Sequence, residues 1–323
     1  IRDLVRSRGL GDVYKRQMNN GKLTITDNKG GGKIVSTGSQ AIGVGSNSVT
    51  NIQKAIVESV EGAVITGYAT GATINIYDGT FSASDNAVIA GNGKSREGTG
   101  NTINISGGVF NGKITTPGYV ACGIYAPWKD NINVTGGTFN ITGGAGIVAR
   151  AGNVTVTNAV FNTTGNATGK VGDSRVVVPC SAIVFDSQAN YPAMNNDSVI
   201  HVVSGKFNSE MNAVSMIKND NETDRVAVTG GTFSTDVKEY LAEGKILQKN
   251  GDTYTAVTNS GITSGTYTAK PTVPDGYKVV ENTDGTFTVE KVGGYYYYQP
   301  TTDTKADDTK GSPKTFDAGI ALY

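Results

Sequence analysis

Three polar residues in the second half of the chain have the types that acid–base or metal chemistry requires. Asp173 and Asp186 are carboxylates, and Arg175 lies two residues after the first of them. Clustered carboxylates with a basic neighbour could hold calcium or act as general acid and base. Such chemistry needs all three groups on one face of the fold, so it depends on the elements that position them.

Aromatic side chains are the best candidates for ligand contacts. Tyr119, Tyr125 and Trp128, the only tryptophan, lie close together in the sequence, and Tyr191 lies in a later insertion. Exposed Trp and Tyr rings can stack on sugar faces, and a ring buried against the interior is the equal alternative. Two insertions, 162–179 and 186–197, flank one repeat unit, and insertions of repeat proteins often gather on a binding face.

The elements that must position these residues are indicated by a recurring pattern, an alternating strand followed by Gly-Gly-x-Phe. Ile103-Asn-Ile105 precedes Gly107-Gly-Val-Phe110, and Ile132-Asn-Val134 precedes Gly136-Gly-Thr-Phe139. Periods of 22–46 residues between successive phenylalanines, with short strands in each unit, are typical of a solenoid. We expect the β-branched residues and phenylalanines to face inward and glycine to supply positive φ in the bend. The phenylalanines are Phe81, Phe110, Phe139, Phe161, Phe207 and Phe233.

The repeat predicts an all-β fold, a right-handed parallel β-helix solenoid of about eight coils between Lys22 and Phe233. A single coil cannot bury enough apolar surface to offset its ordering entropy, so only stacked coils form a core. An antiparallel sandwich is the alternative. The outward position of the first strand in each unit carries no carboxylate, so we expect no catalytic residues on that sheet. The residues at this position are Asn75, Asn104, Asn133, Thr155, His201 and Ala227.

The remaining candidates for metal, thiol or phosphate chemistry favour structural roles. His201 is the only histidine, so a metal site there would lack its usual partners. Asp130 and Asp224 precede strands, where aspartate favours turns, with loosely bound calcium as the alternative. Cys122 and Cys180 lie two coils apart, about 9–10 Å between Cα atoms, so both thiols should be free and buried. The sequence therefore predicts no cofactor and no metal site.

The first residues do not belong to the natural fold. Residues 1–17 resemble the translation of a sequencing-library adapter, and we exclude them. The remaining chain has 23 basic and 26 acidic residues, with neither a basic stripe for nucleic acid nor an apolar stretch long enough to span a membrane. Gly30–Lys33 is too short for a phosphate-binding loop and is interpreted as a turn.

Four regions are expected after the adapter-like segment. Residues 18–235 form the β-helix, and residues 236–257 form a cap with a short helix at Asp236–Gly244 and a hairpin through Asn250-Gly251. Residues 258–292 form a small β module. Residues 293–323 have too few apolar groups to fold and form a disordered linker with a truncated wall-sorting-like segment.

Gly293–Tyr323, with its Tyr-rich linker and Ser312-Pro-Lys-Thr-Phe316, resembles the ends of cell-surface repeat proteins of Gram-positive gut bacteria. Phe316 stands where a sortase motif has glycine, and the hydrophobic helix and basic tail are missing. The resemblance implies an extracellular, cell-surface location, with attachment to peptidoglycan as a further expectation. By fold, the nearest enzymes are the pectate-lyase-like and polygalacturonase-like β-helices.

We therefore expect a non-catalytic adhesin or stalk that presents loops to glycans or to host or bacterial surface receptors. Trp128, Tyr119, Tyr125 and Tyr191 are its expected contact residues. A polysaccharide lyase or glycoside hydrolase that uses Asp173, Arg175 and Asp186 is one alternative, and a phage tail fibre is another. Fold alone does not decide between them.

Overall fold

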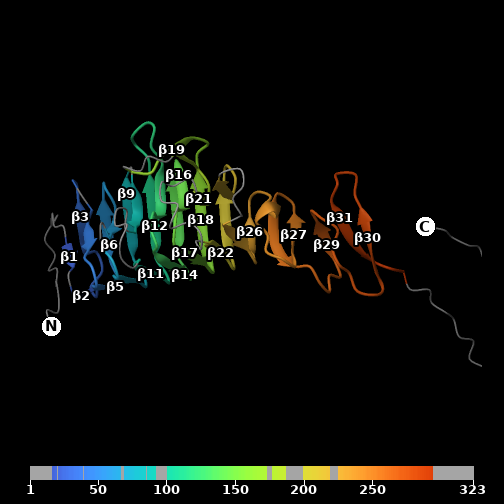
Figure 1. Ribbon diagram of the computed structural model, residues 1–323, viewed down its shortest axis with the longest axis horizontal. Helices are drawn as coiled ribbons and strands as arrows, with labels where there is room; N and C mark the ends of the chain where they lie inside the picture. Colours follow the sequence, from blue (N-terminus) through green and yellow to red (C-terminus); the bar gives the residue numbers. More distant parts are fainter. Residues whose placement is uncertain are drawn as a thin grey trace, which may run out of the picture. The chain divides into compact units, whose positions relative to one another are not determined.

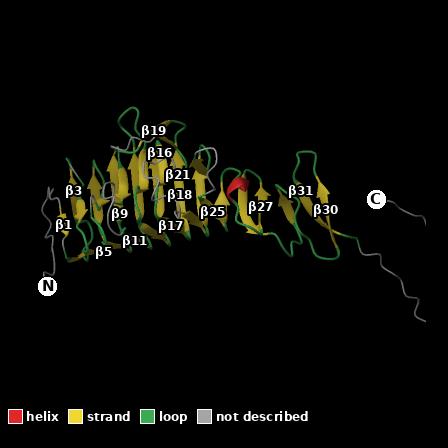
Figure 2. Ribbon diagram, viewed as in Figure 1, coloured by secondary structure: helices red, strands yellow, loops and turns green. Residues whose placement is uncertain are grey.

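The chain is nearly all β in the computed structural model (Figures 1 and 2). The structure describes residues 17–19, 21–38, 40–66, 69–84, 86–91, 100–172, 177–186, 199–218 and 225–293. Most strands pair in parallel, in three long sheets. The predicted all-β class and the long parallel pairing that the repeat implies are therefore confirmed.

Successive strands enter the three sheets in a fixed rotation. Sheet 1 contains β1 (Gln17–Asn19), β4 (Ile42–Val44), β7 (Val64–Ile65), β10 (Ala87–Ala90), β13 (Ala121–Ala126), β16 (Gly144–Ala149), β21 (Ile183–Asp186) and β24 (Val214–Ile217). Sheet 2 contains β2 (Lys22–Thr26), β5 (Val49–Lys54), β8 (Thr73–Ile76), β11 (Thr102–Ile105), β14 (Asn131–Val134), β17 (Asn153–Val156), β22 (Val199–Val202) and β25 (Val226–Val228).

Sheet 3 is longer than the other two. Its parallel part contains β3 (Lys33–Ser36), β6 (Ile56–Ser59), β9 (Thr80–Ser84), β12 (Val109–Lys113), β15 (Thr138–Thr142), β18 (Ala159–Thr164), β23 (Gly205–Ser209) and β26 (Gly231–Phe233). It continues through antiparallel strands, in the order β28 (Thr253–Thr258), β27 (Lys245–Asn250), β29 (Gly265–Tyr267), β31 (Phe287–Lys291) and β30 (Tyr277–Glu281).

The register follows the repeat. Phe110 pairs with Phe81 on one side and with Phe139 on the other. The six repeated phenylalanines are fully buried in a core cluster to which all three sheets contribute. Their rings stack with centroids 4.4–5.5 Å apart and interplanar angles of 8–11°. The inward orientation predicted for these rings is thus confirmed.

The bend before the phenylalanine strand has a glycine with positive φ in five of the six units, and Asn158, with φ of +57°, takes this place before Phe161. Gly79 has φ of +135°, and a Cβ atom at this position would lie 2.4 Å from the carbonyl oxygen of Ala55 in the preceding unit. Any larger residue would therefore separate neighbouring units.

The predicted helix at Asp236–Gly244 is wrong in extent. Only the 3-10 turn η2 (Lys238–Tyr240) forms, with the Asp236 carboxylate accepting a hydrogen bond from the Lys238 N–H at 2.8 Å. Leu241 then forms a parallel bridge with Val228 of β25. Pairing with the last strand of sheet 2 replaces helix propagation, because a short segment gains more from that pairing than from further helical turns.

The hairpin expected through Asn250-Gly251 is present as β27–β28, with Gly251 at φ of +59°. β28 pairs antiparallel with β26, and the buried residues Leu247 and Ala256 join the main core. The strands of 258–292 continue the same sheet through β27 and β29. The chain divides into two compact units, residues 1–291 and 292–323; apart from Gly293, the expected linker lies outside the described residues.

Candidate functional site

The outer face of sheet 3 carries a row of asparagines, each directly after a buried phenylalanine. Because side chains alternate along a strand, Phe110 and Asn111 face opposite sides of the sheet. The Nδ2 atoms of Asn140, Asn162 and Asn208 each donate to the Oδ1 atom of the preceding asparagine, at 3.2, 2.9 and 2.9 Å. We call this row the sheet 3 ladder; it consists of Asn111, Asn140, Asn162 and Asn208.

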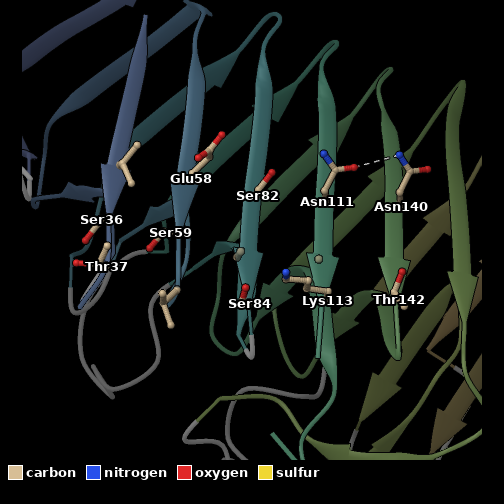
Figure 3. A pocket seen from close by; sticks show the side chains of 14 residues that line it. Ser36, Thr37, Glu58, Ser59, Ser82, Ser84, Asn111, Lys113, Asn140 and Thr142 are labelled. Atoms are coloured by element: carbon tan, nitrogen blue, oxygen red, sulfur yellow. Dashed lines mark hydrogen bonds between the residues drawn. The ribbon is translucent and has the colours of Figure 1, made fainter. Parts of the chain in front are cut away.

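The sheet 3 ladder ends at Asn111, because the matching positions of earlier units hold other residues. Asn111 pairs with Ser82, and Ser82 pairs with Glu58, which pairs with Val35. Figure 3 shows the Asn111 oxygen directed toward Asn140 and its nitrogen directed away from it. The Nδ2 atom of Asn111 has no hydrogen-bond acceptor within the described part of the chain.

A groove of about 510 Å³ opens where the ladder ends (Figure 3). It crosses five strands, from β3 to β15. Its hydroxyl groups belong to Ser36, Thr37, Ser59, Ser82, Ser84 and Thr142. The amides of Asn111 and Asn140, the charged groups of Glu58 and Lys113, and the apolar side chains of Val35 and Val60 complete most of the lining.

The two charged residues of the groove have opposite signs and come from strands two positions apart. The Glu58 Oε1 atom accepts a hydrogen bond from the Lys33 Nζ atom at 2.7 Å, in an ion pair whose side chains are about half exposed. Lys113 is exposed and forms no ion pair with any described residue. The groove is therefore rich in hydroxyl and amide groups, and its lining contains one residue of each charge.

Of the aromatic residues predicted to contact a ligand, Trp128 is buried. Its side chain is 2% exposed and packs in a small cluster with Ala151. The ring is not available for stacking on a sugar in this structure, so burial, the alternative that the sequence left open, is observed. Tyr191 lies outside the described residues.

The two tyrosines near Trp128 are half-buried, and both make contacts within the protein. Tyr119 forms a parallel bridge with Lys170. The Tyr125 hydroxyl accepts a hydrogen bond from a terminal Arg150 nitrogen at 3.2 Å. Neither residue lines the groove, so the structure does not join the predicted contact residues into one site.

The expected acid–base residues are only partly described. Asp173 and Arg175 lie outside the described residues, as does Asp224. Asp186 is fully buried, and its Oδ2 atom lies 3.1 Å from the Nε atom of Arg150. Arg150 is a partner that the sequence did not indicate, because the two residues are 36 positions apart and meet only through the pairing of β16 and β21.

Asp130 takes part in a second buried polar cluster. Its Oδ1 atom accepts hydrogen bonds from the backbone N–H of Asn101 at 2.8 Å and from the Asn101 Nδ2 atom at 3.0 Å. Asn101 in turn donates to the carbonyl oxygen of Ala69 and accepts from the N–H of Ala72. These bonds fix turns of successive units, in agreement with the turn role predicted for Asp130.

Part of the insertion 162–179, predicted as a binding loop, covers the outer face of sheet 1 instead. Its short strands β19 (Thr168–Lys170) and β20 (Val177–Pro179) pair with each other. Val171 and Val178 pack there with Cys122, Cys180 and other small apolar residues. Both cysteines are free and buried, as predicted, and burial raises the pKa of each thiol, so neither is a reactive thiolate.

The polar row predicted on sheet 2 is observed in the predicted register. Asn75, Asn104 and Asn133 donate in sequence to the preceding asparagine at 2.8, 2.8 and 2.9 Å, beginning with Asn51 as acceptor. His201 continues the row between Thr155 and Ala227 and is exposed. We call Asn51, Asn75, Asn104 and Asn133 the sheet 2 ladder.

The glycine run before Lys33 is a turn in which the N–H groups of Gly30 and Gly32 are already engaged. The Asp27 carboxylate accepts hydrogen bonds from the N–H groups of Lys29, Gly30 and Gly32. These N–H groups, Gly32 first, hold the pKa of Asp27 below its ordinary value. The turn therefore binds its own carboxylate.

The described residues contain no group of three or more His, Cys, Asp or Glu side chains arranged to hold a metal ion. No helix among them is long and apolar enough to cross a membrane. No family model, curated protein or solved structure matches the chain. The groove is the candidate site, and its signal in the sequence is the repeated Phe-Asn pair, which gives way to Phe81-Ser82.

Proposed function

We propose that this protein is a non-catalytic cell-surface adhesin or stalk that binds glycans in the groove of sheet 3. The groove carries the proposal, because hydroxyl, carboxylate and amide groups recur at the spacing of strands, about 4.8 Å, across five neighbouring strands. Repeated donors and acceptors along a line suit a polymer whose hydroxyl groups also recur. We expect such glycans to be displayed on host or bacterial surface receptors.

The proposed scaffold is a right-handed parallel β-helix. The strict rotation of strands among three sheets supports this proposal. Each return to the same sheet is a crossover between parallel strands, and such crossovers are almost always right-handed. On this scaffold the groove lies along the direction in which the units stack.

The proposal includes an extracellular location at the surface of a Gram-positive cell, with peptidoglycan as the attachment point. It rests on the resemblance of residues 293–323 to wall-sorted ends. Glu58 is the one carboxylate among the groove-lining residues, whereas hydrolysis of a glycosidic bond ordinarily uses a pair of carboxylates. This supports binding over catalysis at this site.

The test incubates the purified chain with a panel of plant and mucosal polysaccharides, with and without calcium. Bound protein and newly released reducing ends are both measured. We expect binding to at least one polysaccharide without release. Release of reducing ends would overturn the non-catalytic proposal and favour the alternative, a lyase or hydrolase tested first at Asp173, Arg175 and Asp186.

A matched pair of variants locates the binding. Ser82→Tyr places a large ring on the floor of the groove, whereas Thr155→Tyr places the same ring at a half-buried outward position of sheet 2. We expect Ser82→Tyr to abolish binding and Thr155→Tyr to leave it unchanged. Equal binding by both variants would remove the groove as the site.

A further inference from the structure

We propose that the groove selects an uncharged, hydroxyl-rich glycan chain lying across the strands, with the Asn111 amide as its principal donor. This inference rests on the proposed function and deepens it by naming the class of glycan. The asymmetry of the sheet 3 ladder, the acceptor capacity of Glu58 and the charge balance of the lining carry it.

The direction of the hydrogen bonds in the sheet 3 ladder identifies the donor to the glycan. Asn140, Asn162 and Asn208 each donate an Nδ2 hydrogen to the preceding Oδ1 atom, so all three bonds point the same way. Asn111 accepts at Oδ1, and its Nδ2 atom is the one amide nitrogen of the row that donates to no described residue, so both of its hydrogens remain available to a ligand in the groove. Hydrogen bonds in a chain polarise one another, which strengthens the donor at the open end.

The acceptor lies two strands away, at Glu58. Lys33 occupies the Oε1 atom of this carboxylate, and the Oε2 atom has no donor among the described residues. An ionised carboxylate has about four acceptor sites, so further hydroxyl groups can donate to it. Ser82 lies between Glu58 and Asn111 in register and can both donate and accept.

The charge balance disfavours an acidic polymer. Five strands span about 19 Å from first to last, and Lys113 is the one cation that lines this length. A chain with a carboxylate on every sugar would place most of its charges without a cation, because Lys33, beside the groove, is already paired with Glu58. A neutral chain meets a polar group on every strand, the Glu58 carboxylate on β6 and hydroxyl or amide groups on the other four, and it adds no charge without a partner.

The test measures binding of cellohexaose, xylohexaose, maltohexaose and hexagalacturonate by calorimetry, with the full chain and two variants. Asn111→Asp keeps the acceptor for Asn140 but replaces the open donor with an acceptor. Asn51→Asp makes the same change at the same ladder position on sheet 2, because Asn51 accepts from Asn75 and is also the first of its row. Thermal melting confirms that both variants fold.

We expect at least one neutral hexasaccharide to bind more tightly than hexagalacturonate. Asn111→Asp should weaken that binding about tenfold, and Asn51→Asp should leave it unchanged. Tighter binding of hexagalacturonate, or equal loss in both variants, would overturn this inference and leave glycan binding in place. Binding of none of the four probes, together with none of the polysaccharide panel, would overturn the proposed function itself.

Discussion

The two asparagine ladders have the same hydrogen-bonding pattern but end in different surroundings. On sheet 2 the row begins at Asn51, one strand from the first strand of the sheet, and Thr24 lies beside it. On sheet 3 the row begins at Asn111, and three further strands extend the sheet as the floor of a groove. A ladder by itself is therefore a structural device, and the glycan binding that we propose for sheet 3 depends on the groove in which its ladder ends.

The largest expected effect is on the inner side of sheet 3, directly behind the ladder. Phe139→Ala removes a fully buried ring that stacks on Phe110 at 4.4 Å and on Phe161 at 4.5 Å. We expect the free energy of unfolding to fall by about 3–5 kcal/mol, measured by urea denaturation. A loss below about 1 kcal/mol would mean that the stacked rings are not the core of this sheet.

An intermediate effect separates the structural role of the ladders from recognition. Asn140→Ala and Asn104→Ala each remove a mid-ladder amide that makes two side-chain hydrogen bonds. We expect each variant to lose about 1–2 kcal/mol of stability, because the bonds are equivalent. Only Asn140→Ala should also weaken glycan binding, because Asn140 lines the groove. Reduced binding in both variants would indicate that stability, and not the groove, controls binding.

The smallest effect concerns the turn that joins sheet 2 to sheet 3. Amide hydrogen bonds lower the folded-state pKa of Asp27, so its contribution is present above the unfolded-state pKa and is lost as pH falls through the lowered pKa. We expect the Gly32 amide resonance to titrate below the ordinary aspartate value and to show no such step in Asp27→Asn. Titration at or above the ordinary value would contradict the hydrogen bonding of this turn.

Much of the fold could be predicted because each repeat unit contains the residues that set the faces of its strands and the position of its bend. Alternation along Ile103-Asn-Ile105 sets the inward and outward faces, and the glycine before Phe110 sets the bend. The sheet 2 ladder followed from this alternation. The sheet 3 ladder could have been found by the same argument from the residue after each phenylalanine. The solenoid and its handedness, the surface location and the function stay predictions.

The strand periodicity, the inward phenylalanines, the free cysteines and the outward polar rows can be inferred from the amino-acid sequence alone, because each depends on neighbours along one strand or on a fixed repeat. Only the tertiary structure decided that Trp128 is buried, that Arg150 pairs with Asp186 and that part of 162–179 covers sheet 1. These features depend on contacts between irregular segments far apart in the chain. The groove belongs to this second group, because it forms where units that break the repeat, with Glu58 and Ser82, lie in register with units that keep it.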